Sequence, residues 1–304
     1  LPSALFASKS LEKLKIAFNQ LNLSQQELNF VQNHSEYDEN LNLDLSLAPE
    51  RYVDLRDEEK RVMQILEIII KEPIPRLKRI NMHDFGYKES LGHVIKLSIH
   101  DKGLEFFPEV ITHLDTLTTL HLTNNRLQHI PDTIEQLKKL KSLILTGNDL
   151  QNLPDAIGSL KSLESLKLDN NHLSSLPRSF EKLINLKVLR LQQNDFLDIP
   201  CELWNLSNIR VLPFRRSELS ETSREILRKG LTAVLEYAQQ KRFFYEDLLA
   251  SLEKDSAIPA YIYNIPEICQ IRQILYEKCL LYKNNASKEL QKILKILIIL
   301  LNQM

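Results

Sequence analysis

Residues 117–139 read LTTLHLTNNRLQHIPDTIEQLKK, and residues 140–162 read LKSLILTGNDLQNLPDAIGSLKS. Both stretches fit one pattern, LxxLxLxxNxLxxLPxxIxxLxx, in which seven positions are apolar. The five complete units hold Leu, Ile, Val or Phe at every apolar position and keep the proline each time. A repeat this regular predicts a solenoid in which stacked units share one apolar core. The pattern recurs every 23 residues, in units that begin at Val94, Leu117, Leu140, Leu163, Leu186 and, for a unit that stops halfway, Ile209.

Each part of the repeat has a physical meaning. The Leu-x-Leu segment alternates with a period of two, which predicts a short strand with one face turned inward. The proline fixes φ where the chain crosses to the opposite side, and the apolar residues after it fall three apart, as in a 3₁₀ turn. No single unit can bury its own apolar face, so we expect the stack to fold as one body.

An asparagine follows the predicted strand in four of the units. Its side chain carries both a donor and an acceptor, so it can satisfy backbone groups inside a buried bend. The first unit has Lys102 at this position and the sixth has Ser217, as expected of terminal repeats, which are often irregular. Stacking predicts a ladder of these side chains: Asn125, Asn148, Asn171 and Asn194.

The units resemble the 23-residue leucine-rich repeats of intracellular proteins, in the class with LPxxIxxL on the convex side. They are similar to Ras-group and Ras-suppressor repeats and to the arrays of Roco-type proteins. The resemblance covers about Val94 to Leu219. It implies an α/β fold, a right-handed horseshoe solenoid that binds proteins on its concave strand face.

The flanking sequence divides into further parts. We expect a helical extension and linker over residues 1–50, an N-terminal cap of helix and hairpin over 51–93, the solenoid over 94–219, and a C-terminal capping helix with a helical tail over 220–304. In the N-terminal cap, apolar spacing predicts a helix between Asp57 and Pro73. The hairpin is predicted from strands at 77–82 and 94–99, joined across residues 85–87.

The C-terminal flank begins with Thr222-x-x-Glu225, which fits a capping box. The helix that it starts would bury a stripe from Leu227 to Ala238. The tail shows further helical patterns over residues 243–252, 266–282 and 287–301. The last of these is apolar nearly all round, so it must be buried in a helical bundle or docked onto a partner or a second copy.

Composition narrows the class of protein. The net charge is −1, whereas a dedicated nucleic-acid binder usually carries a basic excess. The three cysteines (Cys201, Cys269 and Cys279) have no paired spacing, which favours a reducing, cytoplasmic location over a disulfide-stapled secreted module or a zinc site. The longest apolar run is far shorter than the roughly 20 residues of a membrane span, so none is expected.

The positions between the buried leucines are free to vary and would lie on the concave face. Their basic residues gather toward the C-terminal end of the array, which would steer an acidic partner. The alternative is a solvated face whose charges serve solubility. The candidate partner-binding residues are His100, His121, Ile144, Lys167, Asp169, Arg190, Gln192, Arg215 and Arg216.

Motifs for catalysis and for cofactors are not found in the sequence. None of the six glycines stands in a P-loop, and HExxH, GxSxG and EF-hand patterns are missing. A metal or acid/base site at His100, Asp101 and His121 is conceivable on neighbouring strands. We nevertheless predict a protein that is not an enzyme and that holds no cofactor.

The sequence leaves three classes of function open, and a non-specific structural role ranks third among them. The first is a non-enzymatic module that binds a protein, with a small GTPase as the first guess on family analogy alone. The second is a bacterial-effector-type adaptor, or a ubiquitin-ligase-like protein, that acts through the helical tail. Cys269 and Cys279 lie in that tail, but it is too short for a ligase domain of the known kind, and neither cysteine has an acidic residue two positions after it.

Overall fold

The computed structural model describes residues 52–81, 83–214 and 219–253. The chain up to Gln239 forms one compact unit, and the chain from Gln240 onward forms a second. Of the second unit only the end of one helix is described. The predicted extension over 1–50 and the tail helices beyond residue 253, with Cys269 and Cys279, lie outside the described residues.

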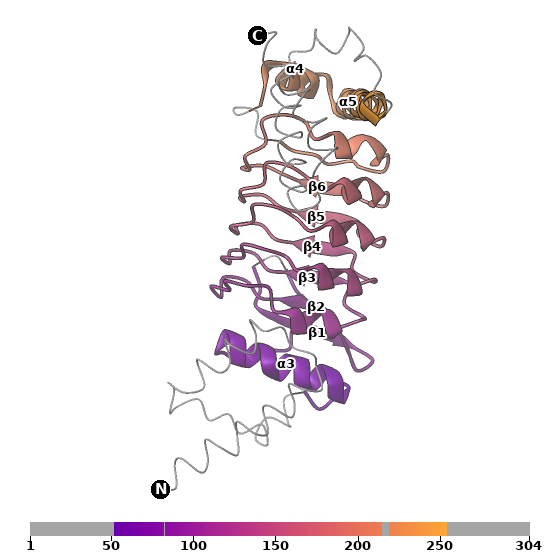
Figure 1. Cartoon of the computed structure of the whole chain (residues 1–304). Helices are drawn as coiled ribbons and strands as arrows, with labels where there is room; N and C mark the ends of the chain where they lie inside the picture. Colours follow the sequence, from indigo (N-terminus) through magenta and orange to yellow (C-terminus); the bar gives the residue numbers. More distant parts are fainter. Residues whose placement is uncertain (1–51, 82, 215–218, 254–304) are drawn as a thin grey trace, which may run out of the picture. The chain divides into compact units, whose positions relative to one another are not determined.

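The first unit is built on a single sheet with strand order β1-β2-β3-β4-β5-β6 (Figure 1). Strands β2 to β6 are parallel and pair in a register that advances one repeat at a time, so that Leu120 lies beside Leu97 on one side and Leu143 on the other. This register confirms that consecutive units stack. The strands are β1 (Gly86–Ser90), β2 (His93–Ser98), β3 (Thr119–His121), β4 (Ser142–Ile144), β5 (Ser165–Lys167) and β6 (Val188–Arg190).

A short 3₁₀ helix follows the proline of each complete unit, on the side of the stack opposite the strands (Figure 1). In every case the proline occupies the N-cap in an extended conformation, which its fixed φ favours. The prediction of a helical turn after the proline is therefore confirmed. These helices are η1 (Glu109–His113), η2 (Asp132–Gln136), η3 (Asp155–Ser159), η4 (Arg178–Lys182) and η5 (Cys201–Asn205).

The apolar positions of the five complete units form one continuous core between the strands and the 3₁₀ helices. Every one of these side chains is buried, and the central strand leucines, such as Leu120, Leu143 and Leu166, are 0% exposed. Burial of this extent supplies the main favourable free energy of folding. Because each unit supplies only a slice of the core, its stability depends on its neighbours.

The predicted asparagine ladder is present. The Nδ2 of Asn148 donates to the carbonyl oxygens of Leu122 and Leu145, both at 2.9 Å, and its Oδ1 accepts from the amide of Leu127 at 3.1 Å. Asn171 and Asn194 repeat this pattern one and two units later. Each asparagine therefore joins its own unit to the preceding one.

The first unit has no asparagine of its own, but like the later units it is bonded to the asparagine of the next unit. The amides of Lys102 and Leu104 both donate to Oδ1 of Asn125, at 3.1 Å each. The Lys102 ammonium pairs with Glu72 at 2.5 Å and lies 4.0 Å from the centre of the Phe85 ring. A lysine is tolerated at this end of the ladder because its side chain turns outward to the cap.

One conformational requirement of the repeat was missed by the sequence analysis. The residue just before the asparagine position has a positive φ of 54 to 70° in every complete unit. This position is held by Asp, Asn or Gly, which tolerate the left-handed region, in every complete unit except the fifth, which has Gln. The residues are Asp101, Asn124, Gly147, Asn170 and Gln193.

The N-terminal cap contains the predicted helix, α3 (Asp57–Ile70), whose apolar face is buried. The predicted hairpin was wrong in position. Its antiparallel strands are β1 and β2, and the turn lies at Leu91 and Gly92, which both have positive φ, rather than at residues 85–87. Gly86 is needed for another reason: a Cβ there would lie 2.5 Å from the carbonyl oxygen of Pro75.

The C-terminal cap also differs from the prediction. The helix begins two residues earlier than a Thr222 cap implies, because Ser220 is the N-cap and accepts from the amide of Ser223 at 3.2 Å. The single predicted helix is two helices, α4 (Glu221–Lys229) and α5 (Leu231–Glu253). Gly230 separates them with a φ of 98°, a value that ends an α-helix.

Candidate protein-binding face of the repeat sheet

The candidate site is the outer face of the parallel sheet, which we call the strand face. It is formed by the side chains that alternate with the buried leucines of β2 to β6. The central residue of each unit pairs with its counterpart in the next unit, so the row runs unbroken along the sheet. This row is Ser98, His121, Ile144, Lys167 and Arg190.

The N-terminal end of the strand face is covered by the cap itself. Residues 81 and 83–85, which we call the cap segment, lie over β2 and β3, the first two strands of the parallel part of the sheet. The Ser98 hydroxyl donates to the carbonyl oxygen of Asp84, and the rings of His83 and His100 meet edge to face at 5.3 Å between centroids. As a result Ser98 is 0% exposed and His121 only 6% exposed. A partner therefore cannot reach these positions unless the cap segment moves.

Burial under the cap segment changes the chemistry of His121. It lowers the pKa of His121 to about 4, and the nearby ammonium groups of Lys167 and Lys96 act in the same direction. A hydrogen bond that the His121 ring donates to the backbone of Asn81, and the carboxylate of Asp84, oppose the shift only in part. At neutral pH His121 is therefore uncharged and adds nothing to a basic surface.

Two other predicted residues of the strand face are also buried. Ile144 is 4% exposed although it lies outside the main apolar core, and Asp169 is 7% exposed. The carboxylate of Asp169 lies 3.2 Å from Nε of Arg190 and accepts from the amide of Gln192 at 3.3 Å. Asp169 thus positions Arg190 rather than presenting a negative charge.

Arg190 is the best-defined basic group of the strand face. Its side chain is 40% exposed, and its Nη2 donates to Oε1 of Gln192 at 3.3 Å. Lys167 lies one strand earlier in register with it and is half-buried. Arg215 and Arg216, which complete the predicted basic cluster, lie outside the described residues.

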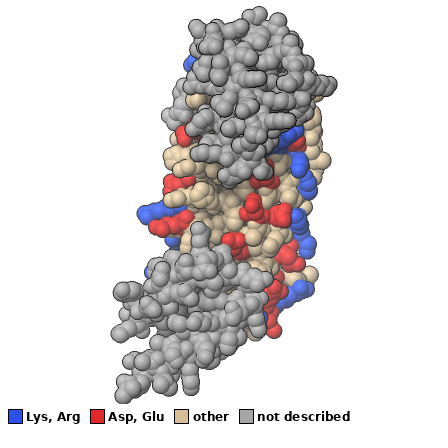
Figure 2. Space-filling model, in the orientation of Figure 1, with Lys and Arg blue, Asp and Glu red and all other residues tan. Residues whose placement is uncertain are grey.

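A second charged row, along the start of the strands, was not singled out from sequence. Glu164 pairs with Lys187 at 2.6 Å and with Lys141 at 4.0 Å. Hydrogen bonding to Lys187 lowers the pKa of Glu164 below its usual range. The signal was present as Lys, Glu and Lys at one position of three successive repeats. In the face shown in Figure 2, acidic and basic groups are interspersed rather than gathered into one patch of a single sign.

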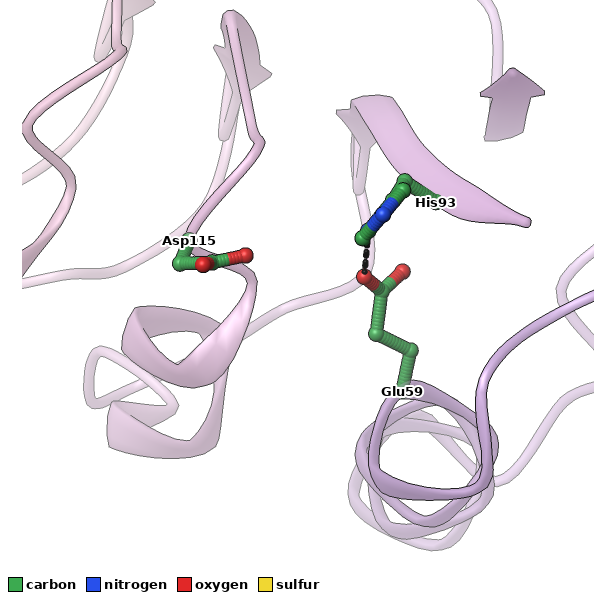
Figure 3. A group of neighbouring side chains, drawn as sticks. All are labelled: Glu59, His93 and Asp115. Atoms are coloured by element: carbon green, nitrogen blue, oxygen red, sulfur yellow. Dashed lines mark hydrogen bonds and ion pairs between the residues drawn. The ribbon is translucent and has the colours of Figure 1, made fainter. Parts of the chain in front are cut away.

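The conceivable metal or acid/base site at His100, Asp101 and His121 is not formed. These residues do not reach ligand spacing, and Asp101 lies exposed in the left-handed turn. Within the described ranges, one other group does reach it: Glu59, His93 and Asp115, at the junction of the cap and the first repeat (Figure 3).

Comparison with known proteins agrees with the fold. Residues 96–150 and 115–173 match the leucine rich repeat family. A search of curated proteins gave no significant match. No helix in the described ranges is long and apolar enough to cross a membrane.

Solved structures with leucine-rich repeats resemble part of the chain. A leucine-rich-repeat protein of Leptospira interrogans shares 37% identity over 39% of this chain and 30% of its own, with a TM-score of 0.38. An internalin from Listeria monocytogenes shares 21% identity over 40% of this chain and 35% of its own, with a TM-score of 0.36.

A third structure is the leucine-rich-repeat ectodomain of a plant membrane receptor kinase from Arabidopsis thaliana, in complex with CASPARIAN STRIP INTEGRITY FACTOR 2. It shares 26% identity over 44% of this chain and 20% of its own, with a TM-score of 0.37. The matched regions thus span about a third or less of these proteins. With its repeat pattern, its parallel in-register strands and the family match over residues 96–173, this chain contains an array of leucine-rich repeats.

Proposed function

We propose that the chain is a non-enzymatic module that binds a protein partner through the C-terminal half of the strand face. The observation that carries the proposal is the partly exposed side chain of Arg190, held by Asp169 and Gln192 on a surface that the leucine core leaves free to vary. Repeats of this family are typically protein-binding modules.

The position of Arg190 supports an anionic partner group. Its contacts to Asp169 and Gln192 hold the side chain in place before binding, which reduces the entropy lost on association. Arginine is enriched at interface hot spots because its planar donor fork fits carboxylates. Asp169 neutralises part of its charge, so the expected partner places a carboxylate directly against the guanidinium rather than relying on long-range attraction.

The cap segment limits the footprint of such a partner. Because it covers Ser98 and His121, we propose that binding is centred on β5 and β6. Arg215 and Arg216, which lie outside the described residues, are further candidates from the sequence. This footprint differs from a site spread over the whole strand face, which would include His100 and His121. A small GTPase is one acidic-surfaced partner of this kind, proposed from the resemblance of the repeats to Ras-group and Roco-type arrays. We place the protein in the cytoplasm, in keeping with its unpaired cysteine spacing.

Affinity capture from the source cells, read by mass spectrometry, tests the proposal. The full chain is compared with the double variant Lys167→Glu, Arg190→Glu and with Arg126→Glu, a charge reversal at an exposed residue beyond the strand in the second unit. Proteins captured by the wild type and by Arg126→Glu, but lost from the double variant, are the expected result. Capture of the same proteins at the same yield by all three chains would overturn the proposal.

The alternative function, an adaptor or ubiquitin-ligase-like activity in the helical tail, has a separate test. In this test Cys269 and Cys279 are replaced by serine in the full chain, with no change at any residue of the strand face. Loss of ubiquitin discharge, or of captured partners, in this variant alone would assign the function to the tail. Self-association through the C-terminal helix is tested by sedimentation velocity of the full chain over a range of concentrations.

A further inference from the structure

Three side chains with metal-binding groups meet where the N-terminal cap joins the first repeat. Glu59 comes from α3, His93 opens β2, and Asp115 follows η1. One ligand atom from each lies within 4.8 Å of the others. In Figure 3 the Glu59 carboxylate rises from its helix toward the His93 ring, and the Asp115 carboxylate points toward the same pair.

Glu59 is held in one orientation by the backbone. Its Oε2 accepts from the amide of Val94 at 2.6 Å, and its Oε1 lies 2.7 Å from Nδ1 of His93. The residue is 4% exposed, so the carboxylate is fixed and largely shielded from water. Fixed, hydrogen-bonded ligands of this kind raise metal affinity because little ordering is needed on binding.

Asp115 completes the group from the solvent side. It is exposed, and it makes no hydrogen bond or ion pair in the described part of the chain. A second carboxylate beside the buried Glu59 is an unfavourable placement unless a positive charge sits between the two. A divalent cation supplies that charge, and the exposed side leaves room for a water ligand.

The repeat framework does not account for these residues. The other complete units have neither a histidine at the position of His93 nor an acidic residue at the position of Asp115. The residues that match His93 are Thr116, Lys139, Ser162 and Asn185, and those that match Asp115 are Lys138, Lys161, Ile184 and Ser207. The combination of groups thus belongs to the cap junction alone among the five complete units.

We propose that Glu59, His93 and Asp115 bind a divalent cation, with Zn²⁺ as the best match to one imidazole and two carboxylates. Tetrahedral Zn²⁺ with ligands at about 2 Å sets the ligand atoms roughly 3.3 Å apart. The Glu59–His93 contact of 2.7 Å must therefore open slightly. His93 binds through Nδ1 as the neutral tautomer that keeps its proton on Nε2, and water fills the fourth position.

The bound cation would tie three elements together. It joins α3 to the start of β2 and to the turn after η1, and so it fastens the cap onto the end of the solenoid. This role is separate from partner binding on the strand face, so either proposal can fail alone.

The variant Asp115→Asn tests the site in the full chain. The purified protein is freed of metal with a chelator, titrated with ZnCl₂ by calorimetry and melted with and without Zn²⁺. Because Asp115 is exposed and makes no described contact, the Tm of metal-free Asp115→Asn should equal the Tm of the metal-free wild type. We expect it to bind Zn²⁺ at least tenfold more weakly and to lose a rise in Tm of several degrees that the wild type shows.

Two controls make the result specific. Asp195→Asn removes the carboxylate of an exposed pair with His172, 3.5 Å apart, and should leave Zn²⁺ binding unchanged. His93→Asn should weaken binding as Asp115→Asn does. Any Zn²⁺ bound elsewhere in the chain, by cysteines or by other histidines, would contribute equally to all variants. Equal affinity and equal Tm shifts in the wild type and in Asp115→Asn would therefore overturn the proposal.

Discussion

Asn148 donates from Nδ2 to the carbonyl oxygen of Leu122, 26 positions earlier in the chain, at 2.9 Å. The same nitrogen donates to Leu145 in its own unit, so one amide group bridges two stacked repeats. Strand hydrogen bonds join neighbours at the sheet, and this contact joins them inside the bend. The stack is therefore coupled at two levels.

Asn148→Ala should be strongly destabilising. The change leaves the amide of Leu127 buried without its side-chain partner, at roughly 1–3 kcal/mol before relaxation. It also removes one of the two asparagine donors to the carbonyl oxygens of Leu122 and Leu145, which keep Asn125 and Asn171. We expect a loss of about 3 kcal/mol in the free energy of unfolding, measured in urea. Gln128→Ala, at an exposed position nearby, serves as the control and should change it by less than about 0.5 kcal/mol. A loss no larger than that of the control would contradict the bridging role.

Substitutions at two glycines distinguish the cost of a steric clash from the cost of backbone strain. A Cβ on Gly158, in η3, would lie 2.3 Å from the carbonyl oxygen of Ser179, whereas a Cβ on Gly103 meets nothing within 4 Å at a φ of +66°. Gly103→Ala should cost about 1 kcal/mol through strain alone. Gly158→Ala should cost more, about 2–4 kcal/mol, because the two units must move apart. Urea unfolding that ranks the variants in the opposite order would show that η3 and η4 are not packed this closely.

The burial of His121 predicts an acid-sensitive stability. Its pKa falls from 6.5 to about 4 in the folded chain, so the unfolded chain takes up the proton first. The stabilisation is fully present above about pH 6.5 and is lost as the pH falls toward 4. Between pH 7.5 and 5 the loss should be about 2 kcal/mol from this residue.

His121→Asn should remove that part of the pH dependence, while His129→Asn, at an exposed histidine, should retain it. The measurement is urea unfolding of the three chains at both pH values. If His121→Asn keeps the full pH dependence of the wild type, the histidine is not shielded by the cap segment.

Much of this fold was predictable because the spacing of apolar residues, Asn and Pro in each repeat predicts the conformation of that repeat. The strands, the 3₁₀ turns and the asparagine ladder follow from spacing that recurs in every unit, so each reading was checked several times within one sequence. The positive φ at Asn124 and Gly147 was missed although the residue types at that position indicated it. Spacing alone draws attention to apolar residues and not to conformation.

The caps were predicted less well because each occurs once. The turn was predicted at residues 85–87, and local sequence could not show that Gly86 is required there by the approach of Pro75. The cover over Ser98 and His121 depends on a tertiary contact of the cap segment, and no repeat position encodes it. The junction of Glu59 with Asp115 joins residues far apart in the chain, which spacing within one repeat cannot reveal.

The most direct test of the account is the dissociation constant of a captured partner for two charge reversals of the full chain. Lys167→Glu, Arg190→Glu should bind at least 100-fold more weakly than the wild type, since opposing carboxylates would then meet like charge. Arg126→Glu should bind within about twofold of the wild type, because a reversal outside the interface is nearly neutral. Unchanged affinity in the double variant, or an equal loss in Arg126→Glu, would contradict the assignment of binding to the strand face.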